Sequence, residues 1–141
     1  MGAGLVGSYV ACRLADRGHE VHEHDMNPQP KVVGYPGVTI HHGDALDHCS
    51  ELNEYAEVDI VVNMLPGDIG NIAMNTLNEQ SYRTVDLSFS GDTPDLHDEK
   101  AKGWNTSILW DVGIAPGLSN MLLAEAYRKL MGMHKATDRR V

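Results

Sequence analysis

Apolar side chains follow two different spacings along this chain. Val6, Val10 and Leu14 recur every four residues, as on one face of a helix, and Gly18 lies where such a helix would end. Residues 58–65 form instead a nearly continuous apolar run rich in β-branched side chains, as in a parallel strand that is covered on both faces. The sequence therefore predicts both helices and buried strands.

The remaining segments alternate between the same two patterns. They are bounded by glycine, proline and polar residues, and they predict strands over 19–25, 38–40, 82–88 and 107–110 and helices over 50–55, 69–77, 95–102 and 120–131. Strands that alternate with helices throughout a chain are typical of a doubly wound parallel sheet with right-handed crossovers. The predicted fold class is therefore α/β.

Length and charge narrow the class of protein. A chain of 141 residues suits one domain. Its formal net charge of -9 and its pI of about 5.2 argue against nucleic acid or a membrane surface as a partner, because both attract clustered Lys and Arg. Its longest apolar runs are far shorter than the roughly 20 residues that span a bilayer. Its two cysteines do not make a disulfide framework, so we expect a cytoplasmic protein.

A glycine loop opens the chain. Residues 2–7 match the pattern G-x-G-x-x-G, in which the first glycine allows a tight turn, the second lets the backbone approach a pyrophosphate, and the third lets the helix pack on the sheet. The alternative is a glycine-rich turn with no special purpose. Only Met1 precedes the loop, so we expect a Rossmann-type sheet that lacks its first strand. The predicted cofactor-binding residues here are Gly2, Gly4, Leu5, Val6 and Gly7.

An acidic residue strengthens the dinucleotide interpretation. Asp25 lies 18 residues after Gly7, near the end of the second predicted strand, where a carboxylate accepts hydrogen bonds from the adenosine ribose. A carboxylate there repels a 2′-phosphate, and no arginine follows it, so NAD is favoured over NADP. The alternative is an ordinary solvated turn aspartate.

Two further groups of polar residues follow later strands. Asn63, Leu65 and Pro66 end the run 58–65, at the carboxyl edge of the sheet where ligands bind in open α/β folds. Simple termination by Pro-Gly explains this segment equally well. Asp86 and Ser88 end the next strand on one face, where they would contact either a polar ligand or each other in a buried turn.

The segment 111–120 runs from a strand end through a loop of glycine and proline into the last predicted helix, which Ser119 would cap. The helix N-terminus suits a carboxylate or a phosphate. A well-capped crossover explains Ser119 fully but leaves Asp111 without a reason.

Histidines and cysteines give no catalytic candidate. Six of the eight histidines fall between His19 and His48, but neither long helices with i, i+4 histidines nor paired thiolates accompany them, so we favour exposed polar edges over a metal site. Cys12 and Cys49 are interpreted as packing residues rather than nucleophiles. No proton-transfer residue is assigned.

Four ordered motifs together resemble the saccharopine dehydrogenase family, and most of all its lysine 6-dehydrogenase-like members. They are Gly2–Gly7, Asn63–Pro66, Asp86–Ser88 and Asp111–Asn120, and the last is the most specific. The resemblance implies an NAD(P)-dependent oxidoreductase that acts on the CH–NH group of an amino acid, a small-molecule substrate, through an imine, with a homodimer as its full-length form.

The resemblance also assigns roles and a domain division. The glycine loop, Asp25 and the Asn63–Pro66 segment would hold the cofactor, and Asp86, Ser88, Asp111 and Asn120 would shape the substrate pocket. Residues 1–117 would form the cofactor domain, and 118–141 would lead toward a substrate domain that the chain does not contain. We therefore expect a cofactor-domain fragment, with a non-catalytic NAD-binding module or a non-functional fragment as alternatives.

Overall fold

The structure of the protein is a computed structural model that describes residues 1–27, 31–55, 57–89 and 91–137. The chain divides into two compact units, Met1–Trp110 and Asp111–Val141. Each unit is described separately below. Among the described helices, none combines the length and the apolar character needed to cross a membrane.

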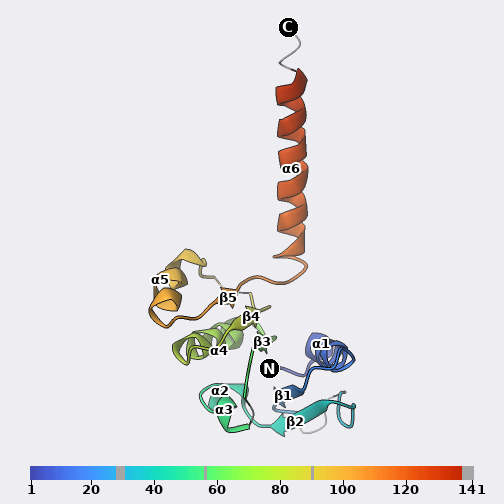
Figure 1. Cartoon of the computed structure of the whole chain (residues 1–141), viewed down its shortest axis with the longest axis vertical. Helices are drawn as coiled ribbons and strands as arrows, with labels where there is room; N and C mark the ends of the chain where they lie inside the picture. Colours follow the sequence, from blue (N-terminus) through green and yellow to red (C-terminus); the bar gives the residue numbers. More distant parts are fainter. Residues whose placement is uncertain (28–30, 56, 90, 138–141) are drawn as a thin grey trace. The chain divides into compact units, whose positions relative to one another are not determined.

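Helices and strands alternate through the first unit (Figure 1). Its helices are α1 (Leu5–Ala15), α2 (Ala45–His48), α3 (Leu52–Tyr55), α4 (Gly67–Glu79) and α5 (Asp95–Gly103), and its strands are β1 (Val21–Asp25), β2 (Val38–His42), β3 (Val61–Asn63), β4 (Thr84–Asp86) and β5 (Ile108–Leu109). Sequence patterns predicted every one of these elements except α2. That helix is a single turn, and it begins where the Asp44 side chain accepts a hydrogen bond from the Leu46 N–H.

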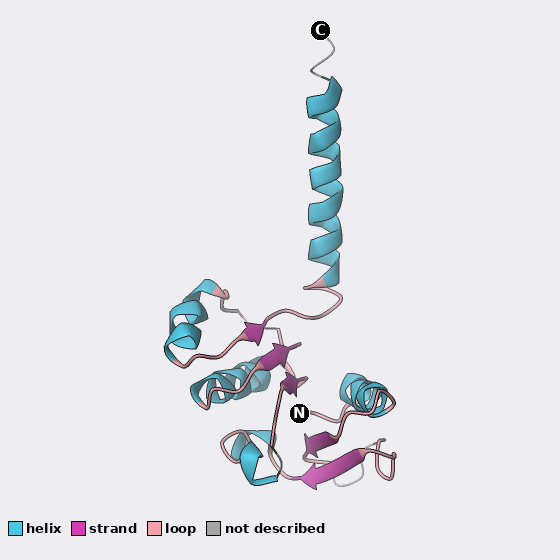
Figure 2. Ribbon diagram, in the orientation of Figure 1, coloured by secondary structure: helices cyan, strands magenta, loops and turns pink. Residues whose placement is uncertain are grey.

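The strands form two small sheets in which every pair is parallel (Figure 2). β1 pairs with β2, and β3, β4 and β5 pair in that order. The α/β class with parallel strands is therefore confirmed, and the arrangement is Rossmann-like. The apolar run 58–65 contributes only a three-residue strand, and Ile60, which was expected to be covered, is 54% exposed.

Met1 and Gly2 join the two sheets. In the described residues no strand precedes the glycine loop, but the Met1 nitrogen donates to the Val62 carbonyl at 2.8 Å and the Met64 N–H donates to the Met1 carbonyl at 3.0 Å. On the other side, the Gly2 N–H donates to the His24 carbonyl at 2.9 Å. These bonds place two residues of backbone between β1 and β3, at one end of the position that a central strand would fill.

Helices α1 and α4 both bury small residues, and α4 also buries the large side chains of Met74 and Leu77. α1 buries Gly7, Ser8 and Ala11, and α4 buries Gly70, Ala73, Met74, Leu77 and Asn78. In contrast, Val6 is 54% exposed, and Ile69 and Ile72, which were predicted on the buried face of their helix, are also about half exposed. The reason is close approach, since a Cβ at Gly70 would overlap Ser88 and the Leu65 carbonyl.

The second unit contains one long helix after a short loop. α6 (Leu118–Thr137) has 20 residues. It begins two residues before the predicted start and continues past Gly132, where the sequence predicted its end. Ser119 lies in its first turn and donates its hydroxyl to the Asn120 side chain at 3.1 Å, so the prediction that Ser119 caps this helix is wrong.

The α4 core provides a test of the packing. Leu77 is fully buried in the cluster formed with Met1, Cys49, Leu52 and Val61. We expect Leu77→Ala to lower the free energy of unfolding by about 2–5 kcal/mol, because truncation leaves a cavity. Ile72→Ala, at the half-exposed position on the same helix, should cost much less. Urea unfolding of both variants measures the difference, and equal losses would contradict this packing.

Candidate functional site

Two glycines of the loop are required by its own geometry. Gly2 has φ of +92°, and a Cβ there would lie 3.1 Å from the Met64 carbonyl oxygen. A Cβ at Gly7 would overlap the Gly2 carbonyl oxygen. Larger residues at either position would force the loop away from β3 or open the first turn of α1.

Gly4 is different, because no described part of the chain requires a glycine there. It is the N-cap of α1 with φ of −67°, and a Cβ would meet no atom from another part of the described chain within 4 Å. The first turn of α1 carries no acidic residue, so its amides and partial positive charge are available to an anion. The loop thus has open space at the one glycine where a pyrophosphate would approach.

Asp25 lies directly against this loop. Its Oδ2 atom accepts a hydrogen bond from the Ala3 N–H at 2.6 Å, and its Oδ1 atom accepts one from the Asn27 N–H at 2.7 Å. Since each carboxylate oxygen has a second lone pair, both can accept a further hydrogen bond from a ligand hydroxyl. The structure therefore brings together the glycine loop and the acidic residue that the sequence predicted to act with it.

The loop after β3 also adjoins the glycine loop. A Cβ at Gly2 would lie 3.3 Å from the Leu65 Cδ2 atom, and Pro66, the N-cap of α4, is exposed. Asn63 is fully buried, and its Oδ1 atom accepts from the Leu65 N–H at 3.3 Å. Leu65 is thus placed beside the predicted cofactor loop, Pro66 follows it at the start of α4, and Asn63 fixes the turn from within.

Asp86 and Ser88 join Asn63 in an internal network. The Asn63 Nδ2 atom donates to Asp86 at 2.6 Å and to the Gly70 carbonyl at 2.8 Å. The Ser88 hydroxyl donates to Asp86 at 2.8 Å. Asp86 is fully buried and Ser88 is 3% exposed, so these side chains hold the ends of β3 and β4 to α4. Their contact with a substrate stays a prediction.

Asp111 and Asn120 belong to the second unit. Asp111 has φ of +54°, and the Gly117 backbone lies so close to the Asp111 carbonyl that a Cβ at Gly117 would contact it. Asn120 lies in the first turn of α6, where its Oδ1 atom accepts from Ser119. The structure therefore assigns both residues to one loop and helix start, and their role in a substrate pocket stays a prediction.

Four histidines form a stacked cluster that the sequence did not reveal. His22 and His24 of β1 stack on His41 of β2, with ring centroids 5.1 Å and 4.6 Å apart, and His48 of α2 lies 5.0 Å from His24. His24 is only 2% exposed, so the prediction of exposed polar edges is wrong for it. Over the described residues, no three His, Cys, Asp or Glu side chains are placed to hold a metal ion.

Burial shifts the pKa of several groups near this cluster. Burial, together with the smaller effects of His41 and His48, lowers the pKa of His24 to about 3. It also raises the pKa of Glu23, an effect that the nearby Met1 ammonium opposes. Burial raises the pKa of the Cys49 thiol to about 11, so this sulfur stays protonated near neutral pH and acts as a packing residue.

The comparisons with known proteins give one partial match. No protein-family model matches the chain. Alpha-aminoadipic semialdehyde synthase from Arabidopsis thaliana is 30% identical over 79 residues, which cover 56% of this chain and 7% of that protein. The chain is therefore similar to a small part of a much longer enzyme.

The histidine cluster predicts a pH dependence. Because the pKa of His24 in the folded chain lies well below its ordinary value of 6.5, the unfolded chain binds the proton first as the pH falls. Stability is retained above about pH 6.5 and is lost progressively below it. We expect the urea midpoint to fall between about pH 7 and about pH 5, and to fall less in His24→Gln.

The matched control is His19→Gln, at an exposed histidine, which should leave the pH dependence of the urea midpoint as it is in the unmodified chain. If His24→Gln and the unmodified chain lost stability in parallel over this range, a buried neutral imidazole would not be the cause.

Proposed function

We propose that this chain is the NAD-binding part of an oxidoreductase that acts on the CH–NH group of an amino acid. The observation that carries the proposal is the glycine loop itself. It leaves open space at Gly4 on the N-terminus of α1, while Asp25 contacts the same loop at 2.6 Å.

Each part of the dinucleotide has a suitable group in the first unit. The amides at the start of α1 suit the pyrophosphate, because helix N-termini favour phosphate. Asp25 suits the adenosine ribose hydroxyls, since a carboxylate accepts both. Leu65 and Pro66, at the carboxyl end of β3, suit the nicotinamide half.

Asp25 favours NAD over NADP. Its carboxylate repels a 2′-phosphate, and Met26 and Asn27 follow it where an NADP-binding protein needs an arginine. Neither residue carries a positive charge.

Two observations support the reaction class. The four motifs resemble the saccharopine dehydrogenase family, and the Arabidopsis match is a semialdehyde synthase. NAD, when bound, would accept a hydride from the carbon next to the amino acid nitrogen. The residues of the chain would bind and orient that cofactor. The match spans only 7% of that enzyme. That this chain acts on an amino acid is therefore part of the proposal.

The buried network favours one alternative, an NAD-binding module without turnover. Asp86 and Ser88 are the polar residues that end β4, and their side chains bond to Asn63 and to each other inside the unit. NADH formation that depends on an added amino acid separates the two functions. Binding of NADH without such turnover would favour the module.

Gly4 provides the sharpest test of cofactor binding. Serine is a good N-cap, so Gly4→Ser should leave the urea midpoint unchanged or raise it, yet its side chain would fill the open space. We expect NADH affinity to fall at least about tenfold by titration calorimetry. The matched control is Gly103→Ser, where a Cβ also meets open space but lies outside the loop. Equal affinities in both variants would overturn the assignment.

Asp25 tests the choice of cofactor. The unmodified chain should bind NADH more tightly than NADPH, by about tenfold or more. Asp25→Asn keeps one acceptor oxygen but removes the charge, so we expect weaker binding of NADH and stronger binding of NADPH. A damaged loop would weaken both ligands alike, and that result would count against an electrostatic role for Asp25.

A further inference from the structure

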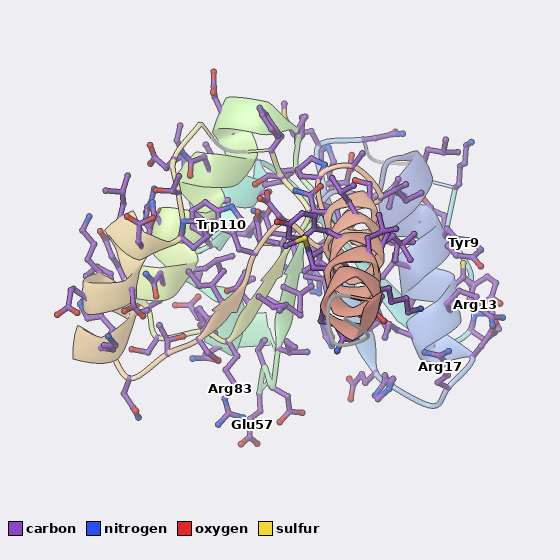
Figure 3. The ribbon with its side chains drawn as sticks, turned by 90° about the horizontal axis from the view of Figure 1, so that it is seen from above. Tyr9, Arg13, Arg17, Glu57, Arg83 and Trp110 are labelled. Carbon is purple, nitrogen blue, oxygen red and sulfur yellow. The ribbon has the colours of Figure 1, made fainter. Side chains whose placement is uncertain are left out.

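The outer side of α1 combines an aromatic ring with two positive charges. Tyr9, Arg13 and Arg17 follow one another at intervals of four residues, the last of them just beyond the end of the helix. All three are exposed, and Tyr9 is 67% exposed although its ring is large and mostly apolar. Figure 3 shows the three side chains along the same side of α1. We call them the α1 stripe.

The α1 stripe is accessible because α1 packs through its opposite side. The helix lies against β1 and β2, and its buried residues are Gly7, Ser8 and Ala11. Residues two positions apart lie on nearly opposite sides of a helix, so Tyr9 and Arg13 point away from the sheet. Side chains at intervals of four form a ridge that fits the groove of another helix. The shape of the stripe therefore suits a helical partner.

The charge of the stripe is opposite to that of the chain as a whole. The formal net charge is -9, yet α1 contains no acidic residue. Arg13 lies 3.6 Å from Asp16, but this pair is exposed and Asp16 also accepts a hydrogen bond from the Tyr35 hydroxyl at 2.7 Å. Such a pair contributes little. Arg17 forms no ion pair with any described residue. Two guanidinium groups are thus available to carboxylates.

Helices α4 and α5 differ from α1 in this respect. α4 contains no lysine or arginine. α5 places its lysines among acidic residues, and Lys102 forms ion pairs with Asp98 at 2.6 Å and with Glu99 at 3.3 Å. The positive charge of α1 is therefore a local feature of one helix.

We propose that the α1 stripe docks an acidic protein helix, whose carboxylates lie four residues apart beside apolar side chains. The carboxylates accept hydrogen bonds from Arg13 and Arg17, and the apolar side chains cover the ring of Tyr9. Tyrosine and arginine are among the residue types that carry most of the binding energy in protein interfaces. Nucleic acid suits the stripe less well, because the net negative charge of the chain repels a polyanion.

This inference does not depend on the proposed cofactor. The stripe leaves out Leu5 and Val6, which the cofactor proposal uses, and its test contains no dinucleotide. Failure of either proposal therefore leaves the other intact.

The first part of the test compares two peptides by titration calorimetry with the whole chain. One peptide consists of four repeats of Ala-Glu-Leu-Ala, and the other has glutamine in place of glutamate. The measurement uses about 0.1 M salt, where charges more than about 10 Å away are largely screened. We expect saturable binding of the glutamate peptide and at least about threefold weaker binding of the glutamine peptide.

The second part uses exposed substitutions, which should leave the urea midpoint unchanged. Arg17→Glu should weaken binding of the glutamate peptide by about threefold to tenfold. Tyr9→Ala should weaken binding of both peptides by about fivefold, because the ring contacts their shared leucines. The matched control is Arg83→Glu, which makes the same charge change at an exposed arginine away from α1 (Figure 3) and should leave both affinities unchanged.

Four outcomes would overturn the proposal. The first is no binding of the glutamate peptide, and the second is equal affinity for the two peptides. The third is an equal loss in Arg17→Glu and Arg83→Glu, which would show that only the total charge matters. The fourth is a different occupant. Self-association that Arg17→Glu abolishes would identify a second copy of the chain, and binding of single-stranded DNA in place of the glutamate peptide would identify nucleic acid.

Discussion

The backbone hydrogen bonds of Met1 and Gly2 are the interaction on which the first unit depends. Through them β1 and β3 become neighbours of one short piece of chain, although neither strand pairs with the other. A two-stranded sheet such as β1–β2 is marginally stable at best by itself, so its connection to the three-stranded sheet matters for the unit. The backbone of Met1 and Gly2 thus connects the two sheets that the five described strands form.

The same two residues also fix the candidate site. Gly2 continues directly into the glycine loop, so the bonds that join the sheets also set where α1 begins. Asp25 at the end of β1 and Leu65 after β3 contact this loop from opposite sides. Small residues at the buried face of α1 allow the helix to lie close to the sheet, and its N-terminal amides therefore stand at the sheet edge where ligands bind in such folds.

Local patterns predicted the elements, and long-range pairing decided what they bury. The spacing of Val6, Val10 and Leu14 was sufficient to predict α1, since a helix is specified by its own residues, but it did not predict that Val6 would be 54% exposed. Asn63 and Asp86 are 23 residues apart and become partners only through the register of β3 and β4. In the same way, His24 is buried because β1 pairs with β2 and because α2 approaches β1. The alternation of side chains along one strand predicts neither of these contacts.

Amide hydrogen exchange with and without NADH tests the central claim most directly, because it reports on each backbone group of the loop. If the loop that Met1 and Gly2 position is the cofactor site, the amides of residues 4–7 should exchange more slowly with NADH, as should those after β3. Unchanged exchange throughout residues 2–7 at a saturating concentration of NADH, or protection only at distant segments, would contradict the account.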